Sequence, residues 1–281
     1  MPKDIHSTIT LNDGQKIPYL GLGTWQSRNS DCTQAVSFAL NHAYDMVDTA
    51  QAYNNESRVG KGWKASGRAR ESFFLTTKIW NMNQGVKSTK RSFKKSLKKL
   101  GTDYVDLLLI HWPNVGNFSR TVETWQAMIE LQKEGSVRSI GVSNFTPALI
   151  DDLVEQTNVV PAVNQVEFHL FLYQKDLADY CQEMNIQLEA YSPLARGKFL
   201  NHPTLQQVSK KHGKSTAQVM LAWLVSHDIV AIPKSVHDQR ILENADIFFE
   251  LDKVDLDLLD VLNRNERLIN PPWAPPSWNE E

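Results

Sequence analysis

Short apolar runs rich in β-branched and aromatic residues alternate with amphipathic stretches along the whole chain. Each run is short enough to form one strand, and most begin about 25–35 residues apart, the length of one βα unit. Their apolar character is nearly continuous, which is typical of parallel strands that are buried on both faces. The eight runs cover residues 16–24, 45–49, 72–78, 104–112, 136–143, 162–168, 186–192 and 228–235.

The stretches between these runs show the spacing of helices. Residues 87–100 place Phe93, Leu97 and Leu100 on one side, and residues 120–134 carry a similar apolar face. Residues 216–227 are apolar almost throughout. The longer gap before the last run leaves room for an extra helix near residues 203–213.

Eight strands that alternate with helices predict an α/β fold, the (β/α)8 TIM barrel, over residues 1–281 as a single domain. A doubly wound sheet is the alternative. Alternation around Asp13-Gly14 predicts an N-terminal β-hairpin across the bottom of the barrel. Residues 255–265 predict one more helix, and the tail that follows contains too many prolines to be helical.

Composition narrows the class of protein. Hydrophobic residues make up 41% and charged residues 22%, and the net charge is -2, so no overall field favours nucleic acid or an anionic membrane. The basic stretch 87–99 could bind nucleic acid, but the solvated face of a barrel helix explains it better. No run is apolar for the ~18 residues that a membrane span needs.

The two cysteines, Cys32 and Cys181, are not in a CxxC pair, and the N-terminus lacks the apolar segment of a signal peptide. These features predict a reducing, cytoplasmic setting.

In a barrel of this class the active site lies at the C-terminal ends of the strands. The second strand ends at Asp48 with Tyr53 beyond it, the third at Lys78 and the fourth at His111. An ammonium beside a phenol lowers its pKa from about 10, so Lys78 could tune Tyr53 as a proton donor. Asp48 could hold Lys78, and His111 could donate a hydrogen bond to a carbonyl oxygen.

Each of these residues also has a structural explanation. Asp48 could cap a loop, Lys78 could be a rim charge, and His111 could be a core histidine. Four complementary groups on three consecutive strand ends favour the catalytic interpretation.

At these positions the chain resembles the aldo-keto reductase family over nearly its whole length, and it looks closest to the smaller microbial-type enzymes. Eight motifs in the family's order carry the resemblance. They are GLGTW (21–25), DTAQAYNNE (48–56), TTKIWN (76–81), LGTDYVDLLLIHWP (100–113), GVSNF (141–145), NQVEFH (164–169), AYSPLARG (190–197) and IPKSVHDQRILEN (232–244).

The resemblance implies reversible, NADPH-dependent reduction of aldehydes or ketones, with Asp48, Tyr53, Lys78 and His111 as the catalytic residues. It also implies a set of cofactor contacts. Ser143, Asn144 and Gln165 match the carboxamide contacts, Tyr191 the stacking aromatic, Ser192 and Leu194 the pyrophosphate contacts, Lys234, Ser235 and Arg240 the 2′-phosphate clamp, and Glu243 and Asn244 the adenine contacts.

Two cations beside a phosphomonoester favour NADPH over NADH, which stays the less favoured cofactor. Gly21 and Gly23 lack the third glycine of a Rossmann fingerprint, so a dinucleotide would lie on the last barrel loops instead. We expect no metal, since the sequence shows no clustered set of ligands.

The expected substrate is a small-molecule carbonyl compound in a monomeric enzyme. Trp25, Trp80 and Trp112 match the family's substrate-pocket walls and suit an apolar or aromatic carbonyl. The tail, residues 270–281, carries Trp273 and Trp278, which could close over the pocket, dock on a partner or lie along the barrel side.

Two other function classes stay open at this point. One is a non-catalytic, nicotinamide-binding regulatory protein of the same fold. The other is a barrel lyase or isomerase that acts on a phosphorylated sugar.

Overall fold

The computed structural model describes residues 3–279, and a parallel eight-stranded sheet forms its centre. The strands follow chain order across the sheet. They are β3 (Leu22–Gly23), β4 (Met46–Asp48), β5 (Phe74–Ile79), β6 (Val105–Ile110), β7 (Val137–Ser143), β8 (Val163–Glu167), β9 (Gln187–Tyr191) and β10 (Val230–Ala231). Parallel bridges from Leu20 to Ala231 and from Gly23 to Lys234 join the first strand to the last. The sheet closes into the predicted (β/α)8 barrel, and the doubly wound alternative is wrong.

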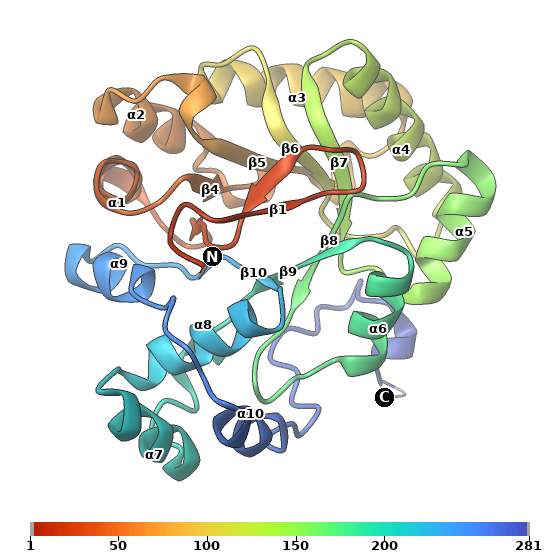
Figure 1. Cartoon of the computed structure of the whole chain (residues 1–281). Helices are drawn as coiled ribbons and strands as arrows, with labels where there is room; N and C mark the ends of the chain where they lie inside the picture. The colour runs from red at the N-terminus through yellow and green to blue at the C-terminus, as the bar shows by residue number, and fades with distance from the viewer. Residues whose placement is uncertain (1–2, 280–281) are drawn as a thin grey trace.

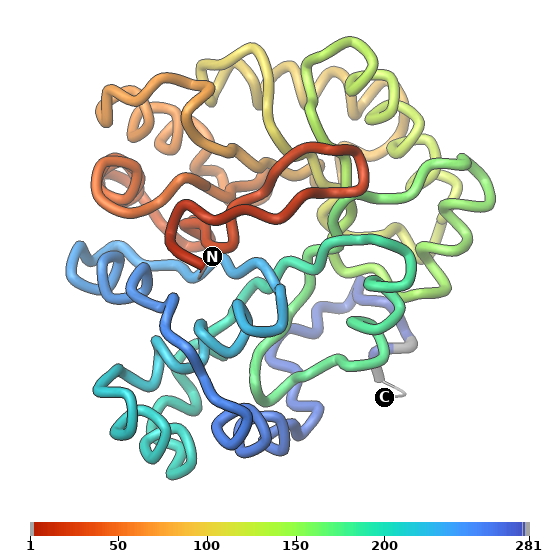
Figure 2. The backbone as a smooth tube through the Cα atoms, viewed as in Figure 1, coloured from red at the N-terminus to blue at the C-terminus, as the bar shows by residue number. Residues whose placement is uncertain are grey.

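The helices form an outer ring around the strands (Figures 1 and 2). They are α1 (Asn29–His42), α2 (Glu56–Ser66), α3 (Val86–Leu100), α4 (Phe118–Lys133), α5 (Pro147–Thr157), α6 (Lys175–Glu183), α7 (Pro203–His212), α8 (Thr216–Ser226), α9 (Asp238–Ala245) and α10 (Lys253–Asp260). The extra helix expected near residues 203–213 is α7. Because α7 packs over α8, the nearly apolar sequence of α8 is buried on more than one side.

Four short 3₁₀ helices lie between these elements: η1 (Gln51–Tyr53), η2 (Arg70–Ser72), η3 (Asn81–Asn83) and η4 (Ala195–Gly197). Of these, η1 follows β4 directly and carries Tyr53.

The N-terminal hairpin pairs β1 (Thr8–Thr10) with β2 (Lys16–Pro18) in antiparallel register. Its apolar side chains Leu11 and Ile17 are buried in one cluster with Met46 and Phe74, the first residues of β4 and β5. The hairpin therefore closes the N-terminal end of the barrel, and it lies in front of the strands in Figure 1.

The core has two layers because successive side chains of a strand point to opposite faces. On β6, Leu107 and Leu109 belong to the cluster inside the barrel, whereas Leu108 and Ile110 pack against the helices. Because both faces of a barrel strand are buried in this way, each strand requires a run that is apolar almost throughout. At the seam, Gly23 allows close approach, since a Cβ there would lie 2.5 Å from the carbonyl oxygen of Ile232.

Three sequence expectations needed correction. The run 16–24 is divided between the hairpin strand β2 and the barrel strand β3, because Pro18 has no N–H to continue a ladder. The helix expected over 255–265 ends at Asp260. The tail does contain one helical turn, η5 (Pro276–Asn279), which begins at a proline whose missing N–H is not required there.

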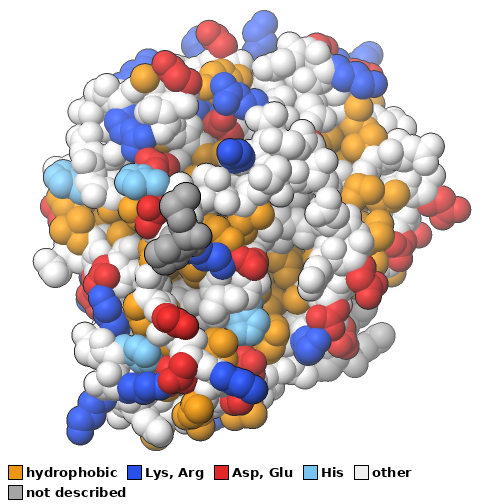
Figure 3. Space-filling model, in the orientation of Figure 1, with side chains coloured by type: hydrophobic (Ala, Val, Ile, Leu, Met, Phe, Trp, Pro, Cys, Tyr) orange, Lys and Arg blue, Asp and Glu red, His pale blue; other side chains and the backbone are white. Residues whose placement is uncertain are grey.

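Acidic and basic side chains are interspersed on the face shown in Figure 3. The basic stretch 87–99 lies on α3, whose Phe93 and Leu100 are buried, so its charged side faces outward. Lys90 pairs with Glu130 at 2.7 Å. Within residues 3–279, no helix has both the length and the apolar composition that crossing a membrane requires.

Candidate active site

Lys78 lies at the centre of a buried cluster at the C-terminal end of the barrel. Its Nζ atom is 2.6 Å from both carboxylate oxygens of Asp48 and 3.3 Å from the hydroxyl of Tyr53. It also donates to the carbonyl oxygen of Thr49 at 3.1 Å. The strands β4 and β5 are neighbours in the sheet, which brings residues 30 positions apart in the chain into contact.

Burial and charge compete on the Lys78–Asp48 pair. Both side chains are buried, with exposures of 0% and 2%. Burial opposes the charged form of Lys78, yet the carboxylate of Asp48 raises the net pKa of the ammonium above its usual value. Burial raises the pKa of Asp48, and the Lys78 ammonium and the Gln165 amide oppose that rise. The two short contacts at 2.6 Å describe an ion pair.

Tyr53 differs from the sequence expectation in its acidity. Burial is the largest effect on its phenol, and Lys78 opposes burial without overcoming it, so the pKa of Tyr53 rises to about 12. The expectation that Lys78 would bring this pKa below its usual value of about 10 is therefore wrong for the protein alone. A phenol with this pKa is protonated at neutral pH and can donate a proton.

His111 follows β6 and lies between Tyr53 and Trp80. Its ring centroid is 5.5 Å from that of Tyr53 and 5.2 Å from that of Trp80, both in edge-on geometry. Burial, helped by the charge of Lys78, lowers the pKa of His111 well below its usual value. The imidazole is neutral at physiological pH and carries one N–H donor.

A network of side-chain amides and hydroxyls lies beside these groups. Asn144, in a left-handed conformation with φ of 67°, donates to the carbonyl oxygen of His111 at 2.9 Å and accepts from the Tyr191 hydroxyl at 2.7 Å. Ser143 donates to the backbone oxygen of Gln165 at 2.7 Å. Tyr191 is thereby held in place beside Asp48, Tyr53, Lys78 and His111, which are called the reactive cluster below.

These residues border one elongated cavity of about 890 Å³. Among the predicted catalytic, cofactor-binding and pocket-wall residues, only Lys78 and Ser143 do not line it: Lys78 lies beneath Asp48 and Tyr53, and Ser143 supports Gln165 and Asn144. The cavity walls include Asp48, Tyr53, His111, Asn144, Gln165, Tyr191, Ser192, Leu194, Lys234, Ser235, Arg240, Glu243 and Asn244.

The far end of the cavity is cationic and polar. Lys234 and Ser235 follow β10, and Arg240, Glu243 and Asn244 lie on α9. Lys234 and Arg240 are exposed, whereas Asn244 is only 5% exposed. The cavity thus runs from a reactive cluster to a pair of cations.

Indole rings form the wall near the reactive cluster. Trp25, Trp80 and Trp112 all line the cavity, with Trp25 39% exposed and Trp112 6% exposed. The tail adds Trp273 to this wall, with its ring centroid 5.8 Å from that of Trp80. Trp278 packs against Trp112 at 5.4 Å but lines a separate cavity with Gln174 and Arg267.

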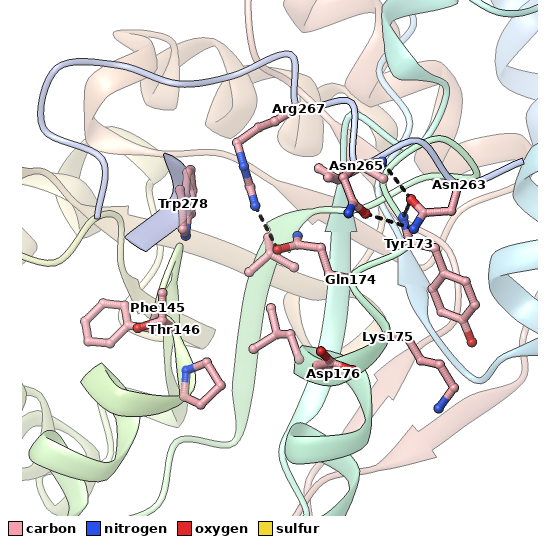
Figure 4. Close-up of a pocket in the computed structure, with 14 residues that line it drawn as sticks. Phe145, Thr146, Tyr173, Gln174, Lys175, Asp176, Asn263, Asn265, Arg267 and Trp278 are labelled. Atoms are coloured by element: carbon pink, nitrogen blue, oxygen red, sulfur yellow. Dashed lines mark hydrogen bonds between the residues drawn. The ribbon is translucent and has the colours of Figure 1, made fainter. Parts of the chain in front are cut away.

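The tail is attached by several interactions. Glu167 on β8 accepts backbone N–H groups from Leu268 at 3.0 Å and Ile269 at 3.0 Å. Arg267 donates to Gln174 at 3.0 Å, and its guanidinium lies 4.0 Å from the ring centroid of Trp278 (Figure 4). Of the tail's expected range, 270–281, residues 280–281 lie outside the described part of the chain.

Sequence reasoning missed two residues at this site. Arg196, in the short helix η4 after β9, lines the cavity, and its guanidinium lies 4.7 Å from the ring centroid of Trp25. Glu189 lies fully buried on β9 and accepts a hydrogen bond from Gln165 at 2.8 Å. A carboxylate within the apolar run 186–192 was the available signal for Glu189.

Across residues 3–279, no group of three or more metal-ligating side chains is close enough to hold an ion. The reactive groups at the carboxyl ends of the strands, with a long cavity beside them, define a (β/α)8 barrel of the kind that carries enzyme active sites. The model of the aldo/keto reductase family matches residues 19–264. This chain belongs to that family.

Individual relatives agree over nearly the whole chain. Glyoxal reductase of Bacillus subtilis (strain 168) is 46% identical over 270 residues, which cover 95% of this chain and 97% of that protein. The crystal structure of an aldo/keto reductase from Brucella melitensis is 48% identical with a TM-score of 0.88, covering 91% of this chain and 99% of that one. The crystal structure of a Bombyx mori aldo-keto reductase in complex with NADP is 36% identical with a TM-score of 0.87. The match covers 94% of this chain and 95% of that one.

Proposed function

We propose that this protein reduces aldehydes or ketones to alcohols with NADPH, and that it catalyses the reverse oxidation under suitable conditions. The observation that carries the proposal is the contact of the buried Lys78 with both Asp48 and Tyr53, which line the long cavity. A protonated phenol, a buried cation and a neutral imidazole are the groups that carbonyl reduction requires.

Tyr53 is the proposed general acid. Its phenol is protonated at neutral pH, because burial raises its pKa to about 12. When the substrate oxygen gains electron density, the phenol gives up its proton, and the ammonium of Lys78 at 3.3 Å stabilises the phenolate that remains. Asp48 keeps Lys78 in this position.

His111 is proposed to orient the substrate. The neutral imidazole can donate one hydrogen bond to the carbonyl oxygen, and its edge-on contacts with Tyr53 and Trp80 restrict the ring. Because the pKa of His111 is well below its usual value, this donor keeps one protonation state across the neutral range.

The cavity fits a phosphorylated dinucleotide in its donors and its size. Lys234, Ser235 and Arg240 supply cations and a hydroxyl at the far end, and the volume of about 890 Å³ falls in the range of ligand sites. Ser192 and Leu194 also line the cavity and are proposed to contact the pyrophosphate, and Tyr191, which donates to Asn144, is proposed to stack on the nicotinamide. When bound, NADPH supplies the hydride that the carbonyl carbon receives.

The remaining cofactor contacts are proposed for residues at the two ends of the cavity. Glu243 and Asn244 on α9 are proposed to hold the adenine. The amides of Asn144 and Gln165 are proposed to hold the carboxamide, with Ser143 supporting them. Two cations at one phosphate favour NADPH over NADH.

The proposed substrates have an apolar or aromatic body. Trp25, Trp80 and Trp112 provide flat apolar walls beside His111. Similarity to a glyoxal reductase adds small dicarbonyl compounds. The proposed working unit is one barrel domain whose tail completes the pocket.

The test is steady-state oxidation of NADPH with a panel of aldehydes, ketones and dicarbonyls, with NADH in parallel. Wild-type protein should turn over with a preference for NADPH. Tyr53→Phe should bind NADPH as wild type does and lose at least about 10²-fold in kcat, the usual contribution of a general acid. NADPH binding without turnover on any carbonyl would instead favour the regulatory alternative.

A further inference from the structure

Glu189 is a buried carboxyl that the proposed reaction does not use. Its side chain lies inside the barrel on β9 with 0% exposure. The Nε2 atom of Gln165 donates to Oε2 of Glu189 at 2.8 Å and to Oδ2 of Asp48 at 3.1 Å. One amide group therefore connects Glu189 to the Lys78–Asp48 pair.

This arrangement fixes which way the Gln165 amide points. The Asp48 carboxylate, paired with Lys78, accepts hydrogen bonds and cannot donate them, so the NH₂ end of the amide faces Asp48 and, through the same Nε2 atom, Oε2 of Glu189. The amide oxygen is turned away from them. Without Glu189 the amide would keep only the Asp48 acceptor, and its rotation would be less restricted.

Glu189 also faces the charged groups of the reactive cluster. Asp48 reaches it from β4 and Lys78 from β5, and Tyr53 of η1 interacts with it electrostatically. On its other side β10 presents Val230, which carries no charge. The three groups Glu189, Asp48 and Lys78 are neutral overall when Glu189 is protonated. They carry one net negative charge when Glu189 is ionised.

Burial is the main reason that this carboxyl holds its proton. Burial and the nearby Asp48 raise the pKa of Glu189 to about 8, while Gln165 and Lys78 oppose the rise. Tyr53, with a pKa of about 12, does not titrate in that range. His111, with its lowered pKa, does not either.

We propose that Glu189 is a positioning residue of the reaction site, which fixes the Gln165 amide and whose protonation state sets the net charge around Tyr53. The proposal rests on the proposed function. An ionised Glu189 makes Tyr53 a weaker proton donor, so carbonyl reduction slows as Glu189 loses its proton. The same charge favours an oxidised nicotinamide ring, which is positive, over the neutral reduced ring.

The first test compares kcat/KM for carbonyl reduction from about pH 6 to about pH 9.5 in wild type and Glu189→Gln. Wild type should lose about three- to tenfold through an ionisation near pH 8, and Glu189→Gln should lack that ionisation. Glu56→Gln is the matched control, because Glu56 is also fully buried but accepts from Thr77 and Lys99. The control should keep the wild-type profile. An unchanged ionisation in Glu189→Gln overturns the proposal.

A second measurement needs no turnover and is independent of how well the variant folds. Calorimetric titration of NADP⁺ into wild type at about pH 8, in buffers of different ionisation enthalpy, reports proton release. A positive ring near Glu189 should lower its pKa, so wild type should release a fraction of a proton. Binding with no proton release overturns the proposal.

The outcomes separate this inference from the proposed function. Wild type that neither binds NADPH nor reduces any carbonyl contradicts the proposed function itself. An active wild type whose profile is matched by Glu189→Gln contradicts only the role of Glu189.

Discussion

The ammonium of Lys78 donates a hydrogen bond to the hydroxyl of Tyr53 over 3.3 Å from a position with no solvent exposure. A buried cation is stable there only because Asp48 neutralises it at 2.6 Å. We therefore propose that the pair contributes to both stability and catalysis, and variants can separate the two contributions.

Lys78→Met should affect both properties. Removal of the ammonium leaves the Asp48 carboxylate buried without its partner, which costs about 3–5 kcal/mol in the free energy of unfolding. It also removes the charge that stabilises the Tyr53 phenolate, so kcat should fall at least about 10²-fold. Denaturant unfolding and steady-state kinetics measure the two effects.

The matched control is the double variant Asp48→Asn with Lys78→Met. It removes both charges and should recover much of the lost stability while staying inactive. Near-normal turnover in Lys78→Met alone would contradict the proposed role of Lys78.

His111→Ala tests the proposed hydrogen-bond donor. We expect kcat/KM to fall about 10²-fold, since one preorganised donor to a developing oxyanion contributes about that much. The dissociation constant for NADPH, measured by fluorescence titration, should stay within about twofold. Because the pKa of His111 lies well below its usual value, wild-type kcat/KM should show no ionisation near pH 6.5. A wild-type ionisation there that disappears in His111→Ala would show that the imidazole titrates.

Arg240→Ala tests the cationic end of the cavity. Loss of a hydrogen bond to a charged phosphate costs about 1.5–3 kcal/mol, so KM for NADPH should rise at least about tenfold. KM for NADH should change little, because NADH lacks the 2′-phosphate. Arg91→Ala, on the exposed face of α3, is the control and should behave as wild type. An equal rise of KM for NADPH and NADH in Arg240→Ala would mean that Arg240 does not bind the 2′-phosphate.

Trp273→Ala tests the contribution of the tail to the pocket. Its ring meets that of Trp80 at 5.8 Å, and such contacts add about 0.5–1.5 kcal/mol beyond the buried area. KM for bulky aromatic aldehydes should therefore rise about three- to tenfold, with little change for the smallest carbonyls.

Deletion of residues 270–281 should extend this change while the barrel stays folded, and Trp273→Phe should retain most of the wall. Identical kinetics for these variants across an aldehyde panel would show that the tail is not part of the pocket.

The pH dependence of stability provides a test of Glu189 that does not involve catalysis. Its folded pKa of about 8 lies above the unfolded value, so the stability it contributes in protonated form is lost as pH rises towards and through 8. Wild type should therefore lose at least about 1 kcal/mol more than Glu189→Gln between about pH 6 and pH 9. Urea unfolding at both pH values measures the difference, and parallel losses would mean that Glu189 titrates at its ordinary value.

Much of the site could be predicted from strand ends. In a closed parallel barrel every strand ends at the same face, so Asp48, Lys78 and His111 had to lie near one another once the eight strands were recognised. The cations Lys234 and Arg240 follow the last strand in the same way. Glu189 escaped prediction because only strand ends were considered, although it lies two residues before Tyr191 and therefore on the same face of β9.

The amino-acid sequence by itself determined the eight βα units, their order and the face on which the reactive side chains gather, because local hydrophobic periodicity specifies strands and helices. Only the tertiary structure decided the pKa values and the side-chain contacts, because these depend on burial and on distances between residues. It showed that burial outweighs Lys78 at Tyr53 and raises its pKa to about 12. It also brought Gln165 between Asp48 and Glu189. Desolvation and charge interactions depend on three-dimensional surroundings, which residues distant in sequence create only when the barrel closes.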